Sequence, residues 1–239
     1  MTDAHDTLTD DLAATVEATR LAERELFGSL DAATRERPIR EGDWNPQDFQ
    51  AHLTAWKARQ ADRYAAVREG RQIPAPMESE EEDALNEELR AARAEWAWDA
   101  LVEEADAVTA RLVGEIRQAD PATLRASERL IAGTFGNGLL HAITHVRWLL
   151  EAGVPLDAPR AAAFAAEATD LVSAAGIPDR DRAIGWYDLA CNHALGGRAD
   201  AARQLLREAF RVSPDLVEFA RTDADLASLA GELDDLVRS

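Results

Sequence analysis

The chain has 239 residues, enough for one large domain or two modest ones with a buried core. Hydrophobic residues make up 46% and charged residues 30% of it, a balance that excludes wholesale disorder. The net charge of -19 excludes a generic binder of nucleic acid or of anionic membranes, because both need a basic face to displace counterions. Cys191 is the single cysteine, which excludes an internal disulfide and a cysteine-rich metal or redox site.

Composition also indicates the compartment and the fold class. No apolar run approaches the roughly 18 residues that a membrane-spanning helix needs, and the acidic start lacks the pattern of a secretory signal. We therefore expect a soluble, cytoplasmic protein. Alanine and arginine are abundant and form helices readily, and nearly every long segment has a 3.6-residue hydrophobic period. Both observations predict an all-α fold.

Hydrophobic spacing and capping residues predict the first two helices. The first helix runs from about Thr9 to Leu30. Its candidate core residues are Leu12, Val16, Leu21, Leu26 and Leu30. The second helix begins at Asn45 and Pro46, because asparagine accepts hydrogen bonds from the first backbone N–H groups and proline suits the first helical position. It continues to about Glu69, where Gly70 stops it.

Two further helices complete the predicted bundle. The third spans about Glu82 to Gln118 and can break near Trp96 and Trp98. The glycine-rich stretch 133–138 is interpreted as an irregular turn, and the fourth helix covers about Leu139 to Ala152. Four helices with a long connection between the second and the third predict a four-helix bundle.

The hydrophobic pattern changes beyond Pro159. Residues 154–160 are the expected boundary between a bundle domain, residues 1–155, and a second helical domain, residues 160–239. An alanine-rich helix opens this second domain, at Arg160 to Ala175.

A helical hairpin over Asp181 to Pro214 resembles one tetratricopeptide repeat. The residues at the characteristic spacing are Trp186, Leu189, Ala190, His193, Gly197, Ala202, Leu206, Ala209 and Pro214. About three repeats are normally needed for independent stability, so a single repeat must dock on the bundle, on another subunit or on a partner. The hairpin is therefore either a helical cap or a segment for protein interaction or self-association.

Three histidines form the most informative pattern. His141 and His145 stand four residues apart on the fourth helix, so both rings project from one face. Two neutral imidazoles at this spacing can reach one metal ion, and His52 on the second helix offers a third ligand. The alternative is that these are structural histidines, which explain an isolated pair at this spacing more often than a metal site does.

Two sequence pieces resemble the DinB-like superfamily. They are WNPQDFQAHLTAW, residues 44–56, and LHAITH, residues 140–145. The segment Ala84–Glu87 onward, with the two tryptophans of the third helix, is similar to the corresponding region of the ClbS/DfsB branch. The resemblance covers about residues 8–153. It implies a DinB-like four-helix bundle, with the tetratricopeptide-like hairpin following it.

The resemblance also implies a metal site and an activity. His52, His141 and His145 would hold a divalent metal, zinc or nickel, and three protein ligands leave room for a substrate atom. Relatives include mycothiol- and bacillithiol-dependent transferases and proteins that protect against genotoxic metabolites. We therefore expect action on a small electrophilic substrate by thiol transfer or hydrolysis. A low-molecular-weight thiol such as mycothiol is a possible cofactor, although no thiol site is identifiable in the sequence.

Two other functions stay open at this point. The first is a protein of the ClbS/DfsB type that binds and sequesters a reactive metabolite without metal or turnover. The second is an interaction module in which the bundle is a scaffold and the hairpin recruits a partner. Three observations distinguish these functions. Metal retention at the histidines supports the metal-dependent protein, ligand binding without metal supports sequestration, and a complex that maps to the hairpin supports the interaction module.

Several tryptophans of the predicted bundle are candidates for a pocket beside the metal. Trp44, Trp56 and Trp148 lie close to the histidines in sequence, and Trp148 follows His145 by three residues on the same helix face. Aromatic core packing is the alternative. The acidic stretch from Glu78 to Glu104 is interpreted as a solvated loop and helix face, and Cys191 as a buried core residue.

Overall fold

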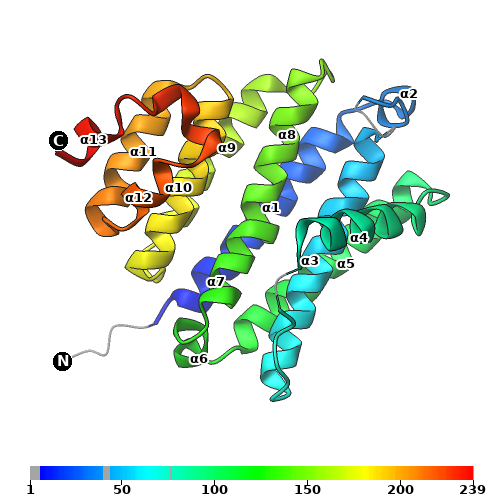
Figure 1. The fold of residues 1–239 in the computed structure, drawn as a ribbon. Helices are drawn as coiled ribbons and strands as arrows, with labels where there is room; N and C mark the ends of the chain where they lie inside the picture. Colours follow the sequence, from blue (N-terminus) through cyan, green and yellow to red (C-terminus); the bar gives the residue numbers. More distant parts are fainter. Residues whose placement is uncertain (1–5, 40–43, 76, 239) are drawn as a thin grey trace.

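The computed structural model describes residues 6–39, 44–75 and 77–238, and these residues form a helical protein (Figure 1). No strand occurs in these three ranges, which confirms the predicted all-α class. Within the same ranges, no helix has the length and hydrophobicity needed to cross a membrane.

Four long helical segments pack against one another in the first two thirds of the chain. They are α1 (Leu8–Gly28), α3 (Pro46–Arg68), α5 (Trp98–Gln118) and the consecutive elements α7 (Glu128–Phe135), η1 (Gly136–Leu140) and α8 (His141–Glu151). Shorter helices lie between them: α2 (Ala32–Arg35), α4 (Ser79–Ala91) and α6 (Pro121–Arg125). In Figure 1, α3, α4 and α5 lie to the right of α8 and the C-terminal helices to its left.

The predicted boundaries of α3 are confirmed, and they fix where its side chains point. Asn45 accepts a hydrogen bond from the backbone N–H of Asp48, and the Asp48 carboxylate accepts one from the backbone N–H of Asn45. Pro46 occupies the first helical position. Gly70 follows the helix with φ +71°, a left-handed conformation that favours glycine. The register of every α3 side chain is therefore set at both ends.

One predicted core residue of α1 is wrong. Leu12, Val16, Leu26 and Leu30 are buried, but Leu21 is 60% exposed. The neighbouring positions Arg20 and Ala22 are buried instead. The charged residue Arg20 occupies a core-facing position of this helix. A prediction from hydrophobicity alone therefore placed the wrong residue in the core.

The glycine-rich stretch before His141 is helical, in contrast to the predicted irregular turn. It includes a π-helical segment, η1, and none of its glycines has a positive φ among the residues described. Glycine is needed here because neighbours approach closely: a Cβ at Gly133 would lie 2.6 Å from the Gln60 side chain, and one at Gly138 3.1 Å from Val16. The predicted break in the third helix is confirmed, because α4 ends at Ala91 and α5 begins at Trp98.

The C-terminal residues form a second group of helices. These are α9 (Ala158–Val172), α10 (Asp179–Leu195), α11 (Ala199–Val212), α12 (Leu216–Ala220), the 3-10 helix η2 (Ala224–Leu229) and α13 (Leu233–Arg238). Helices α10 and α11 form the predicted hairpin, with Gly197 at φ +71° in its turn. Its likeness to a tetratricopeptide repeat stays a prediction.

The C-terminal helices pack directly on the bundle. Helix α9 lies against α1 and α8, and α10 lies against α7. The Gly176 backbone N–H donates a hydrogen bond to the Asp11 carboxylate, 2.8 Å away, at a contact where any Cβ would collide with α1. One continuous cluster of buried hydrophobic residues joins both groups of helices. Docking on the bundle, one of the three predicted ways to stabilise a lone hairpin, is therefore present, and the division into two domains stays a prediction.

Candidate metal centre

The three predicted metal ligands come together where α3 packs against α8. His52 Nε2 lies 2.9 Å from His141 Nε2, and the ring of His145 is 4.6 Å from that of His141 and 5.1 Å from that of His52, centroid to centroid. One ring nitrogen from each histidine lies within 4.8 Å of the other two. The three histidines, which the sequence places on two helices, thus form one cluster in space.

The local helix geometry explains how His141 and His145 reach His52. His141 is the first residue of α8 and directly follows the π-helical segment η1. A π-turn holds one extra residue, so it rotates every later side chain relative to an uninterrupted α-helix. The histidines four residues apart on α8 then share the face that points toward α3. Such π-segments are frequent at functional sites.

Burial keeps the two hydrogen-bonded histidines neutral. It lowers the pKa of His52 to about 4. Burial also lowers the pKa of His141 to about 3, with smaller contributions from the charges of His52 and Lys57. At neutral pH both rings are therefore uncharged, and one donates the hydrogen bond that the other accepts. Neutral imidazole is the form that binds a metal ion, because a nitrogen lone pair must be available.

The donor set fits a divalent metal such as zinc or nickel. Three imidazole nitrogens suit these ions, and a tetrahedral zinc site places its nitrogen ligands about 3.4 Å apart. The three ring nitrogens lie within 4.8 Å of one another, close to that spacing. His52 departs from the usual arrangement, since its buried Nδ1 makes no hydrogen bond to any described residue, whereas metal-binding histidines usually anchor their second nitrogen.

All three tryptophans predicted to line a pocket surround the histidines. The ring centroid of Trp44 lies 5.2 Å from that of His52, Trp56 lies 6.1 Å from His141, and Trp148 lies 4.8 Å from His145. Trp96, a further tryptophan of the predicted third helix, is 39% exposed and lies outside this group. The histidine cluster therefore has an aromatic wall on several sides.

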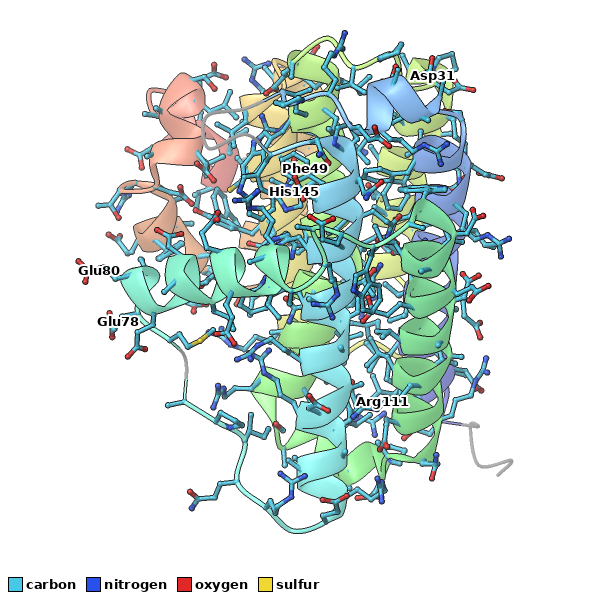
Figure 2. All side chains as sticks on the ribbon, turned by 90° about the vertical axis from the view of Figure 1, so that its right-hand side faces the viewer. Asp31, Phe49, Glu78, Glu80, Arg111 and His145 are labelled. Atoms are coloured by element: carbon cyan, nitrogen blue, oxygen red, sulfur yellow. The ribbon has the colours of Figure 1, made fainter. Side chains whose placement is uncertain are left out.

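Phe49 belongs to this wall and was missed in the sequence. Its ring centroid lies 4.8 Å from His145 and 5.3 Å from Trp44, and Figure 2 shows Phe49 and His145 side by side in the interior. Phe49 precedes His52 by three residues on α3, so helical spacing alone places both on one face. That spacing was the signal available in the sequence.

Helix α4 covers the site with two polar side chains. Asn86 accepts a hydrogen bond from Trp56 Nε1, and Glu87 accepts one from Trp44 Nε1, each at 3.0 Å. Helix α4 has no buried residue, so the acidic segment is a solvated helix face as predicted, and Glu78 and Glu80 point away from the protein in Figure 2. Asn86 and the exposed Glu87 also accept hydrogen bonds from the two indoles. The periodicity of α4 alone did not predict these two hydrogen bonds.

Two cavities meet the histidine cluster. One of about 410 Å³ lies under α4 and is lined by all three histidines, by Trp44 and Trp148, and by acidic residues of α4. A second, of about 700 Å³, lies between His141 and the C-terminal helices and is also lined by Gly136 and Asn137 of η1.

Acidic groups line the second cavity next to Cys191. Tyr187 donates a hydrogen bond of 2.6 Å to Asp223, and the buried Cys191 thiol lies 3.7 Å from the same carboxylate. Burial, together with the charges of Asp223 and Asp188, raises the pKa of the thiol. Cys191 is therefore protonated at neutral pH and is not a nucleophile, in agreement with its predicted role as a buried residue.

No protein-family model, no curated protein and no solved structure matches this chain significantly. The functional argument therefore depends on the site alone.

Proposed function

We propose that this chain is a DinB-like metal-binding protein that acts on small electrophilic molecules, in detoxification or self-resistance. The observation that carries the proposal is the convergence of His52, His141 and His145 at the edge of an aromatic cavity. A purely structural histidine cluster would not require an adjoining cavity of about 410 Å³, which is in the size range of small-molecule sites.

In the proposed site, the metal and the protein side chains have different roles. Zinc or nickel held by the three histidines would lower the pKa of a thiol or of water and so supply the nucleophile for thiol transfer or hydrolysis. Trp44 and Trp148 contact the apolar body of the substrate and exclude water from the histidines. Glu87 and Asn86 fix the indole rings of Trp44 and Trp56 through their N–H groups, which keeps the aromatic wall preorganised.

Charge around the cavity restricts the substrate class. Glu82, Asp83 and Glu87 line it, and among the described residues no lysine or arginine does so. A neutral or cationic electrophile is therefore favoured over an anionic one. In a thiol transfer the thiol, which is the co-reactant, would lose its proton to solvent. Its sulfur would then bond to the electrophilic carbon as the leaving group departs with the electron pair.

Zinc titration of metal-stripped protein tests the proposal. We expect one equivalent to bind to the wild-type chain, and His141→Ala and His145→Ala to weaken binding by about tenfold or more. His193→Ala is the matched control, because His193 lies outside the cluster. Equal zinc affinity in all four proteins would exclude the site.

Sequestration without metal is the second candidate, and one contact favours it. The Nε2 atoms of His52 and His141 already share a 2.9 Å hydrogen bond, so neither of these two nitrogens needs an ion as its partner. Under this function, a ligand of the cavity binds equally well with and without a chelator. The metal-dependent function predicts loss of turnover in chelator, whether or not the ligand still binds.

A further inference from the structure

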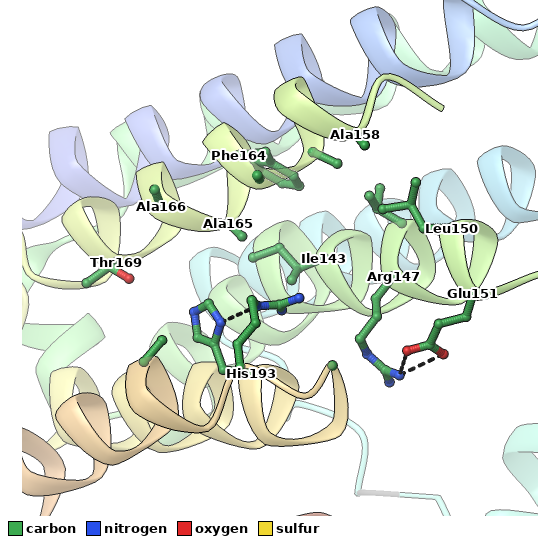
Figure 3. Close-up of a pocket in the computed structure, with 16 residues that line it drawn as sticks. Ile143, Arg147, Leu150, Glu151, Ala158, Phe164, Ala165, Ala166, Thr169 and His193 are labelled. Atoms are coloured by element: carbon green, nitrogen blue, oxygen red, sulfur yellow. Dashed lines mark hydrogen bonds and ion pairs between the residues drawn. The ribbon is translucent and has the colours of Figure 1, made fainter. Parts of the chain in front are cut away.

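A third cavity lies on the opposite side of α8 from the histidines. It has a volume of about 490 Å³ and is enclosed by α8, α9 and the turn between α10 and α11 (Figure 3). Ile143 and Leu150 of α8 form one wall, and Phe164 and Ala165 of α9 form the other. Much of the α9 wall is alanine, and these short side chains leave the space open between two helices that otherwise pack together.

Two arginines, a glutamate and a histidine are the charged or titratable residues that line this cavity. Arg147 forms an ion pair with Glu151 at 2.8 Å, and its Nε donates a hydrogen bond to Asn192. Glu151 is therefore neutralised within the wall. Arg198, from the α10–α11 turn, forms no ion pair with any described carboxylate. The lining thus carries two positive charges and one negative charge, on a chain whose net charge is -19.

The side chain of Arg198 is held at the cavity by two neighbours. Its Nε donates a hydrogen bond of 2.6 Å to Nδ1 of His193. Gly196 makes room for it, since a Cβ there would lie 2.7 Å from the guanidinium. Burial, with a smaller contribution from the positive charge of Arg198, lowers the pKa of His193 to about 4, so this ring is neutral and its remaining proton is on Nε2. His193 is thus a second hydrogen-bond donor at the cavity.

We propose that this cavity is a binding site for an amphipathic organic anion, such as a medium-chain carboxylate. The hydrocarbon chain would lie between α8 and α9 against Ile143 and Phe164, and the carboxylate would pair with Arg198. Guanidinium and carboxylate form charge-assisted hydrogen bonds, and Arg198 has donors available because its Nε alone is used by His193.

The same features argue against other ligands. A cation would meet the two positive charges of Arg198 and Arg147 against the single negative charge of Glu151. A fully polar ligand would leave the apolar walls without contacts, whereas burying each methylene group tightens binding by about fourfold. The inference does not depend on the histidine cluster, which opens to the other face of α8.

Calorimetric titration of the full-length protein with three ten-carbon probes tests the inference. The probes are decanoate, decan-1-ol and decyltrimethylammonium, each below its micelle concentration. We expect decanoate to bind and the neutral and cationic probes to bind at least about tenfold more weakly, because they lack the charge-assisted contact. Equal affinity for decanoate and the cationic probe would overturn the proposal.

Two variants separate the roles of charge and space. Arg198→Gln removes an exposed cation, and we expect decanoate affinity to fall by about tenfold. Ala165→Leu fills the cavity, and we expect it to abolish decanoate binding without changing the far-ultraviolet circular dichroism. Arg211→Gln, an exposed arginine of the same hairpin outside the cavity lining, is the control and should bind normally. Unchanged decanoate affinity in Arg198→Gln would overturn the proposal even if Ala165→Leu fails to fold.

Discussion

The bundle helices up to Glu151 bury most of the polar side chains that the structure encloses, whereas the helices from Ala158 onward bury very few. In the bundle the buried polar residues are Thr15, Thr19, Arg20, Glu23, Gln50, His52, Thr54, Lys57, Gln60, Thr109, Thr134 and His145. Among the described residues of the C-terminal helices they are Asn192 and Ser213. Burying a polar group costs desolvation free energy. Hydrophobic packing alone therefore does not explain why these polar residues are concentrated in the bundle.

A buried ion network lies beside the histidine cluster and is the clearest part of this difference. Lys57, the single lysine of the chain, forms an ion pair with Glu23, and both side chains are almost fully buried. Arg20 lies 3.7 Å from the same glutamate and also pairs with Asp106. In the C-terminal helices ion pairs such as Arg203–Glu232 are partly exposed. The interior of the bundle thus contains buried ion pairs, whereas the interior of the C-terminal helices is mainly apolar.

The largest expected effect comes from breaking the buried pair. Lys57→Met leaves Glu23 buried without its main partner and should lower the free energy of unfolding by about 3–5 kcal/mol. Arg203→Met in the C-terminal helices, where the pair is partly exposed, should cost far less, because solvent screens the interaction between the two charges. Urea denaturation of both variants measures the difference. Similar losses would remove the contrast between the two regions.

Close helix packing in the C-terminal segment predicts an intermediate effect. A Cβ at Gly185 of α10 would lie 2.6 Å from Val172 of α9, so Gly185→Ala should destabilise the protein by about 1–3 kcal/mol. Gly114→Ala in α5 is the opposite case, because its Cβ would meet nothing closer than 4.0 Å. It should stabilise the helix by about 0.5–1 kcal/mol. Thermal unfolding shows whether each variant raises or lowers the melting temperature. A shift in the same direction for both variants would refute this account of the α9–α10 contact.

The last expected effect is pH-dependent and concerns the cavity between the two regions. Burial, with the charge of Asp223, raises the pKa of Asp188 from 3.8 to about 7. Between these values the unfolded chain loses the Asp188 proton while the folded chain keeps it, so this group lowers stability as pH rises. Asp188→Asn should therefore stabilise the protein by on the order of 1–2 kcal/mol at pH 8 and leave it unchanged at pH 4. Urea midpoints at both pH values check this, and equal shifts at both would contradict it.

Much of the helical architecture could be predicted from local sequence signals. Asn45, Pro46 and Gly70 fix the ends of α3, and the spacing of His141 and His145 places both on one helix face. These features depend on interactions between residues a few positions apart, which the sequence displays directly.

Features that depend on distant residues could not be predicted. The burial of Arg20 in place of Leu21 requires partners from α3 and α5, and the helical path of Gly133 and Gly138 depends on how closely α3 and α1 approach. The contacts of Asn86 with Trp56 depend likewise on α4 crossing α3. The anion-binding cavity depends on how α9 packs against α8.

Metal content tests the central claim most directly. Elemental analysis of tag-free protein, before and after reconstitution with zinc or nickel, should give about one metal ion per chain, and His52→Ala should lose most of it while keeping its helical circular dichroism. The absence of metal after reconstitution, or equal metal content in wild type and His52→Ala, would contradict a metal centre at these three histidines.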